Sequence, residues 1–186
     1  IILFLDGRRH VVRGAFDATT GEFAEVVIPR TNAPDLTVSL QLATASTGGL
    51  AMTGALTTPN ETRELLLNRT STPEDANGSV EPGRYTLLLP TDPSVDPDII
   101  PGGSGYGIVK VLPNGRILAN LVLGDGTPVS DATFLDADGS WNLFQSVYGD
   151  GFVAGHLAFR EVENISDIDG SVHWKKNPVA RPGLFT

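Results

Sequence analysis

Two short acidic motifs are the first candidates for chemistry in this sequence. Asp136-Ala137-Asp138-Gly139 and Asp167-Ile168-Asp169-Gly170 each place two carboxylates two residues apart, directly before a glycine. Alternate carboxylates of this kind supply oxygen ligands for calcium in short loops, although both motifs lack the more distant bidentate Glu of an EF-hand. Asp-Gly hairpin turns explain both motifs without a metal. The sequence therefore favours turns, with calcium binding by Asp136, Asp138, Asp167 and Asp169 as the alternative.

Histidine is the second residue type that could serve catalysis or metal binding. In the run 152–160, His156 alternates with the apolar side chains, and His173 does the same between Val172 and Trp174, so both should face solvent. Nothing resembles a two-His zinc helix, a Walker loop or a Gly-x-Ser-x-Gly elbow. With 0 Cys, thiolate zinc sites and cysteine nucleophiles are excluded. We therefore expect no enzyme and no cofactor apart from the calcium alternative; a hydrolase built on His156 or the Asp motifs has less support.

Aromatic side chains are the third group of candidates, because exposed rings can form a platform for sugars. The residues that could contribute to such a ligand-binding surface are Tyr106, Trp141, Tyr148 and Phe152. Packing in the core or at the end of a barrel explains the same four residues equally well.

Charge and hydropathy limit the partners. The chain has 186 residues, 13 Lys+Arg and 22 Asp+Glu, and a net charge of -9, so its surface should repel a nucleic-acid backbone. No segment approaches the roughly 18 apolar residues of a membrane-spanning helix, so we expect no membrane insertion. The start at Ile1-Ile2-Leu3-Phe4-Leu5 lacks Met and resembles the middle of a strand, which predicts a chain processed or cut from a longer protein. Residues 1–5 could alternatively complete the sheet of a neighbouring copy.

The elements that must position these residues are short strands. Residues 35–42 alternate polar and apolar side chains, and Pro113-Asn114-Gly115 separates two apolar runs as a hairpin turn would. The segment 61–68 is the best helix candidate but is too short to show a 3.6-residue period, so we interpret it as a strand. The predicted strands are 1–5, 9–16, 22–29, 35–43, 49–56, 63–69, 84–90, 106–112, 116–123, 129–136, 141–148, 152–160 and 169–175.

Together these strands predict an all-β protein with one domain, 1–186, made of about a dozen antiparallel strands in meandering hairpins. A closed or nearly closed β-barrel accommodates them best, and a two-sheet β-sandwich is the alternative. A loop rich in Pro and Gly at 90–105 joins two halves, about 1–89 and 106–176. Gly21 and Phe23 recur as Gly139 and Trp141 at a constant shift, which indicates either an internal duplication or coincidence.

Several segments also carry a family resemblance. Gly124-Asp125-Gly126-Thr127-Pro128 and Asp138-Gly139-Ser140-Trp141 are prominent among them, and the likeness covers most of 80–176. These segments resemble a β-rich module of large secreted multidomain bacterial proteins of the planctomycete and verrucomicrobial type. The resemblance implies export and an extracellular or cell-surface setting, and it implies no assigned chemistry.

The resulting hypothesis is a non-catalytic structural or adhesive module of a larger bacterial surface protein or fibre. Its expected partners are other domains or copies of the same protein. A small-ligand or glycan-binding β-barrel is the alternative, and it predicts a pocket with a few converging polar groups.

Overall fold

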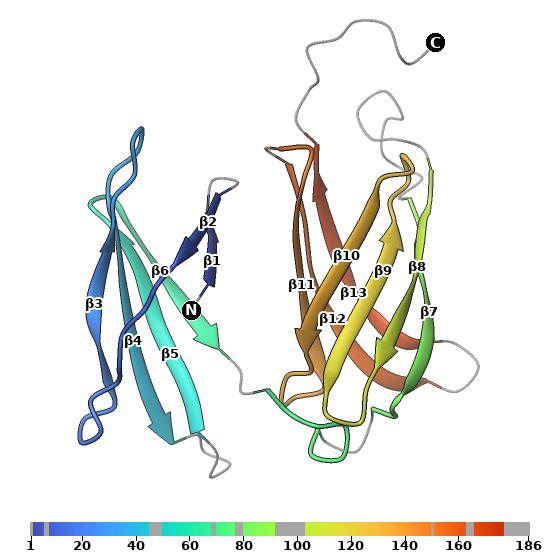
Figure 1. Cartoon of the computed structure of the whole chain (residues 1–186), viewed down its shortest axis with the longest axis horizontal. Helices are drawn as coiled ribbons and strands as arrows, with labels where there is room; N and C mark the ends of the chain where they lie inside the picture. The colour runs from blue at the N-terminus through green and yellow to red at the C-terminus, as the bar shows by residue number, and fades with distance from the viewer. Residues whose placement is uncertain are drawn as a thin grey trace, which may run out of the picture. The chain divides into compact units, whose positions relative to one another are not determined.

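The computed structural model describes residues 2–5, 8–44, 50–67, 70–76, 80–91, 103–149, 151–162 and 166–176. These residues form thirteen strands and no helix, and every strand pairing is antiparallel (Figure 1). The strands are β1 (Ile2–Leu5), β2 (Arg8–Val11), β3 (Glu22–Ile28), β4 (Leu36–Thr44), β5 (Leu50–Thr58), β6 (Glu61–Leu67), β7 (Gly83–Leu89), β8 (Gly105–Val111), β9 (Arg116–Val122), β10 (Pro128–Phe134), β11 (Ser140–Val147), β12 (Gly151–Val162) and β13 (Ser166–Lys175).

The all-β prediction is confirmed, and each predicted strand has a counterpart. Glu61–Leu67 is a strand, as its short length suggested. The largest difference concerns the predicted strand 9–16, which ends at Val11. The reason is packing: Val12 turns into the core, and Phe16 then forms an isolated bridge with Phe23 on β3.

The described residues divide into two compact units, 1–69 and 70–186, whereas the sequence predicts a single domain. The expected boundary in the 90–105 loop also differs from the observed one. That loop connects β7 to β8, and these two strands pair along their whole length, from Gly83 opposite Val111 to Leu89 opposite Gly105. Strand pairing therefore keeps both sides of the loop in the second unit.

The first unit consists of the β1-β2 hairpin and a four-stranded meander in the order β3-β4-β5-β6. Residues 1–5 were a candidate for pairing with another copy, but β1 pairs with β2 of its own chain. One face of the meander carries the apolar residues that the alternation predicts, with Leu36, Val38 and Leu40 buried. They pack in one core cluster with Val12, Phe23 and Ile28.

The second unit contains two sheets, β7-β8-β9-β10 and β11-β12-β13, which face each other in Figure 1. Their inner faces form a single core. Val109, Ile117 and Leu121 from the first sheet join Trp141 and Val153 from the second, and each is at most 2% exposed. The alternation of buried and exposed residues is unbroken along β8, so its outer face points away from this core.

Side chains and tight turns join the two sheets where β10 leads into β11. Asp131 on β10 accepts hydrogen bonds from Trp141 Nε1 at 3.2 Å and from Gln145 Nε2 at 2.9 Å, both on β11. Gly115 lies in the turn of the β8-β9 hairpin, where the sequence predicts a turn, and its φ is 78°. Its carbonyl accepts a hydrogen bond from the Leu135 amide at 2.8 Å, and the Ser71 amide donates to the Leu135 carbonyl at 2.7 Å. Backbone hydrogen bonds thus join the β8-β9 turn, Leu135 and Ser71 at one end of the unit.

The residues that suggested a duplication occupy similar places in the two units. Gly21 and Gly139 both have positive φ, and each directly precedes a strand: Gly21 precedes β3 and Gly139 precedes β11. Phe23 and Trp141 are both buried. Phe16 and Phe134, the other aromatic pair at this shift, differ, because Phe134 is 46% exposed whereas Phe16 is half-buried. Common descent of the two units stays a prediction.

Candidate functional site

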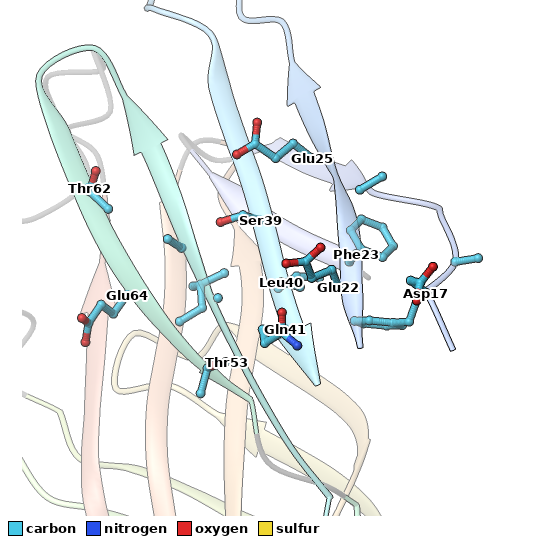
Figure 2. A pocket seen from close by; sticks show the side chains of 16 residues that line it. Asp17, Glu22, Phe23, Glu25, Ser39, Leu40, Gln41, Thr53, Thr62 and Glu64 are labelled. Carbon is cyan, nitrogen blue, oxygen red and sulfur yellow. The ribbon is translucent and has the colours of Figure 1, made fainter. Parts of the chain in front are cut away.

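An open hollow of about 1300 Å³ crosses the outer face of the β3-β6 meander in the first unit (Figure 2). Ser39 and Gln41 on β4 and Thr53 on β5 contribute polar side chains, and Thr62 and Glu64 on β6 line its other side. These residues point outward because their apolar neighbours in sequence, such as Leu40 and Leu65, pack into the core on the opposite face.

The chemistry of this hollow is that of hydroxyl groups flanked by carboxylates. Glu22 and Glu25 come from β3 and Glu64 from β6, and none of the described lining residues is a Lys or Arg. Gln41 is already engaged, because its Nε2 donates to the Thr20 carbonyl at 2.8 Å and to the Leu42 carbonyl at 3.0 Å. The hollow therefore offers hydrogen-bond acceptors to a polar ligand.

A second surface with distinctive chemistry is the outer face of β7-β8-β9-β10, which we call the basic sheet face. The strand register arranges its side chains in rows across the four strands. One row is apolar and consists of Leu88, Tyr106, Val122 and Pro128, of which Leu88 is 65% and Tyr106 60% exposed. Neighbouring exposed apolar side chains can mark interaction surfaces, so this row is a candidate for one.

Three cations lie on the same face beyond the apolar row. Arg84 on β7 is directly opposite Lys110 on β8, and Arg116 on β9 lies diagonally across from Lys110. All three side chains are exposed. None of the described residues forms an ion pair with them, and no Asp or Glu of β7–β10 points outward on this face.

The four aromatic candidates do not come together. Tyr106 lies on the basic sheet face, whereas Trp141 is fully buried in the core, so the sugar-platform interpretation of Trp141 is wrong. Phe152 stacks on Phe144, with ring centroids 6.0 Å apart, on the outer face of β11-β12. Tyr148 lies in the turn that follows β11. A single aromatic platform made of these four residues is therefore not present.

The two Asp motifs form two separate structures. Asp136 and Asp138 belong to the turn before β11, where Asp136 Oδ2 accepts a hydrogen bond from Asn142 Nδ2 at 2.7 Å and Asp138 Oδ1 accepts one from the Ser140 amide at 3.0 Å. Asp167 and Asp169 lie within β13 instead of in a turn, and Asp169 pairs with Arg160. Among the residues with described positions, no three His, Asp or Glu side chains gather in a group that could hold a metal ion. Calcium binding stays a prediction.

His156 and His173 are both exposed, as their position in the strands predicts. His156 Nδ1 lies 3.0 Å from Asn142 Oδ1. Since the Asn142 amide nitrogen donates to Asp136, its oxygen is left to accept, which places a proton on His156 Nδ1. The histidine is thereby held by the turn residues, and the contacts continue through Asp136 to the Ser140 hydroxyl, which donates to Asp136 Oδ2 at 3.5 Å and to Asp138 Oδ1.

Sequence reasoning missed a polar cluster around Asp125. Asp125 Oδ2 accepts hydrogen bonds from the Tyr148 hydroxyl and from Lys176 Nζ, both at 2.7 Å. Lys176 Nζ also lies 4.8 Å from the centre of the Tyr148 ring. Tyr148 has a φ of 57°, which is rare for a residue other than glycine. Asp125 and Lys176 are 51 positions apart, and no local pattern in the sequence predicts that they meet.

The Asp125 cluster should make stability depend on this carboxylate. Burial raises the pKa of Asp125, but hydrogen bonds from Lys176, Tyr148 and Thr127 outweigh it and hold the pKa well below its ordinary value. A depressed carboxyl pKa stabilises the fold above the unfolded pKa, near 4, and the contribution is lost as pH falls below it. We expect Asp125→Asn to lower the free energy of unfolding by about 2 kcal/mol at neutral pH in urea titrations and to flatten the acid limb.

Lys176→Met provides the control for Asp125→Asn. If the two groups interact, the double variant should lose less stability than the sum of the single losses. Strict additivity would show that the Asp125–Lys176 contact contributes nothing.

Tyr148 should give the alkaline limb of the stability profile. Burial and the neighbouring Asp125 carboxylate raise the pKa of Tyr148 to about 12. Because the unfolded chain loses this proton near pH 10, stability should fall as pH rises from about 10 towards 12. Tyr148→Phe should reduce that fall in melting temperature. Burial also raises the pKa of Tyr85, but Tyr85 is present in both wild type and Tyr148→Phe and affects their stability alike. Identical melting temperatures of the two proteins across the alkaline range would therefore contradict the prediction.

Comparison with known proteins adds no assignment: no protein-family model, curated protein or solved structure matches this chain. Within the described ranges there is also no helix of the length and hydrophobicity needed to cross a bilayer.

Proposed function

We propose that this chain is a non-catalytic structural or adhesive module of a larger extracellular bacterial surface protein. The observation that carries the proposal is the apolar row on the basic sheet face, in which Leu88 and Tyr106 are each about two-thirds exposed. The resemblance of 80–176 to modules of secreted bacterial proteins supports the extracellular setting. The filled core of the second unit, with Trp141 and Ile117 completely buried, is consistent with a module that acts through its outer surface.

Cosedimentation with purified, insoluble bacterial cell envelopes tests the adhesive form of this proposal. We expect the wild-type chain to sediment with the envelopes and the Leu88→Ser/Tyr106→Ser variant to stay in the supernatant. Light scattering over a concentration series tests the structural form, for which polymers should appear as concentration rises. A chain that stays monomeric at all concentrations and ignores the envelopes would contradict the proposal.

A second candidate function, small-ligand or glycan binding, is favoured by the hollow on the β3-β6 meander. Its carboxylates and hydroxyl groups would accept hydrogen bonds from the hydroxyls of a sugar. Ser39→Leu should block the floor of the hollow without touching the core. Loss of binding of a neutral oligosaccharide in Ser39→Leu, with Leu88→Ser unaffected, would place recognition in the first unit.

For the second unit we further propose a nearly closed barrel, with a two-sheet sandwich as the alternative. β10 contacts β11, and β13 approaches β7. β7 to β13 are seven consecutive strands of alternating direction, so β7 and β13 run in the same direction. β9, which runs parallel to β7, points the same way as β13 in Figure 1. Antiparallel hydrogen bonding cannot close such a seam. A groove of about 710 Å³ between β7 and β13 agrees with closure that is incomplete there.

A further inference from the structure

We propose that the basic sheet face binds an anionic polysaccharide, one that carries carboxylate or sulfate groups along a chain of sugars. The binding residues are Arg84, Lys110 and Arg116, together with the apolar and polar rows beside them. This inference rests on the proposed adhesive function and names the ligand of that module.

The first observation is a like-charge arrangement that the fold itself does not require. Arg84 and Lys110 face each other directly across β7 and β8, and Arg116 is diagonal to Lys110 on β9. Like charges directly opposite each other destabilise a sheet. No Asp or Glu of β7–β10 points outward on this face, so an anionic ligand would relieve the repulsion among the three exposed cations.

The second observation is what lies next to the cations. The adjacent row contains Thr86, Ile108, Asn120 and Ser130, and Ser130 Oγ donates to Asn120 Oδ1 at 2.9 Å. That contact leaves the Asn120 amide nitrogen to donate to a ligand. The next row contains Tyr106, whose exposed ring can pack against the apolar face of a sugar. Cations, a hydrogen-bonding row and an exposed ring thus follow one another along the strands.

The dimensions favour an extended polymer. The rows lie about 7 Å apart along each strand, because residues on one face are two positions apart at roughly 3.4 Å per residue. From the Arg116 row to the Tyr106 row the face therefore spans about 20 Å, which is long for a single free anion. The acidic side chains elsewhere do not prevent binding, since charges beyond about 8 Å are largely screened at physiological salt.

Affinity electrophoresis through gels that contain alginate, dextran sulfate or neutral dextran tests the inference. Alginate supplies carboxylates and dextran sulfate supplies sulfates, so the two gels distinguish the sources of negative charge. We expect the chain to be retarded by at least one polyanion and not by dextran, with retardation decreasing as sodium chloride is raised. Arg84→Gln/Lys110→Gln/Arg116→Gln should weaken binding by about tenfold or more.

A matched variant controls for net charge. Arg13→Gln/Arg63→Gln/Lys175→Gln removes the same number of exposed cations from other surfaces and should bind the polyanion like wild type. The basic-face variant should remain folded and melt no lower than wild type, because it removes the repulsion between Arg84 and Lys110. Tyr106→Ser supplies a second test with the charges intact, and it should also weaken binding.

Three outcomes would overturn the inference. The first is retardation by neither polyanion, and the second is equal loss of binding in both triple variants. The third is binding to vesicles of phosphatidylcholine and phosphatidylglycerol in equal parts without binding to either polysaccharide, which would assign the face to a membrane surface. A chain that binds cell envelopes through Leu88 and Tyr106 but neither polyanion would keep the adhesive function and lose only its proposed ligand.

Discussion

Trp141→Ala is expected to cost about 3 to 5 kcal/mol of unfolding free energy, the largest effect of any substitution considered for this chain. Trp141 is 0% exposed and lies in the core that both sheets of the second unit share. Removing its indole leaves a cavity between the sheets and also takes away the hydrogen bond from Nε1 to Asp131. Urea unfolding followed by circular dichroism should show the transition shifted to much lower urea, or absent for the second unit.

Two further variants separate the contributions to this loss. Trp141→Phe keeps an aromatic ring in the core but removes part of the ring volume and the hydrogen bond to Asp131, which Gln145 continues to contact, so we expect a loss of about 1 to 2 kcal/mol. Phe134→Ala removes an aromatic ring that is 46% exposed and should cost under about 1 kcal/mol. A Trp141→Ala protein as stable as Phe134→Ala would contradict the assignment of Trp141 to the core.

Gly115→Ala is expected to cost about 2 to 3 kcal/mol, the second largest effect. Gly115 has a φ of 78°, which is unfavourable by about 1 to 2 kcal/mol for residues with a Cβ. An added Cβ would also collide with the Ser71 carbonyl. Relief of that collision must displace the segment at Ser71 and weaken its 2.7 Å hydrogen bond to the Leu135 carbonyl.

Gly126 is a matched control for this prediction. Its φ of 83° is almost the same, but nothing lies within 4 Å of the position that a Cβ would take. Gly126→Ala should therefore cost only the backbone penalty, about 1 kcal/mol, in the same urea titration. Equal losses for the two alanine variants would show that the close approach of Ser71 to the β8-β9 turn does not contribute to stability.

For the basic sheet face, the sequence predicts which residues of a strand share a face but not which residues of neighbouring strands lie opposite each other. Alternation along 106–112 and 116–123 already indicates which residues share a face, because the side chains of a strand alternate strictly. It does not indicate which residue on one strand lies opposite which on the next. Only the register places Arg84 beside Lys110, and Arg84 thereby joins Lys110 and Arg116, two cations of the predicted β8-β9 hairpin, in one group.

Tyr148 and Asp125 show the same limit for polar contacts. Each residue lies in a turn, although the sequence predicts Tyr148 as the last residue of the strand 141–148, and the two turns are separated by the whole of β10 and β11. Their hydrogen bond, and the Lys176 contact that joins it, depend on how the sheets bring their ends together. Rules for turns consider only residues that are neighbours in sequence, so the shifted pKa values of Asp125 and Tyr148 could not be predicted.

The sequence by itself determined the class of the protein and its strands. Glycine and proline punctuation, Asn114-Gly115 and the alternating apolar residues are local signals, and they predicted strands at all thirteen places where the structure has them. The tertiary structure alone decided that 1–69 and 70–186 are separate compact units, that Trp141 is core while Tyr106 is surface, and that two hollows lie on the sheets. The physical reason is that backbone pleating is set by neighbours in sequence, whereas register, sheet packing and burial depend on contacts between residues distant in the chain.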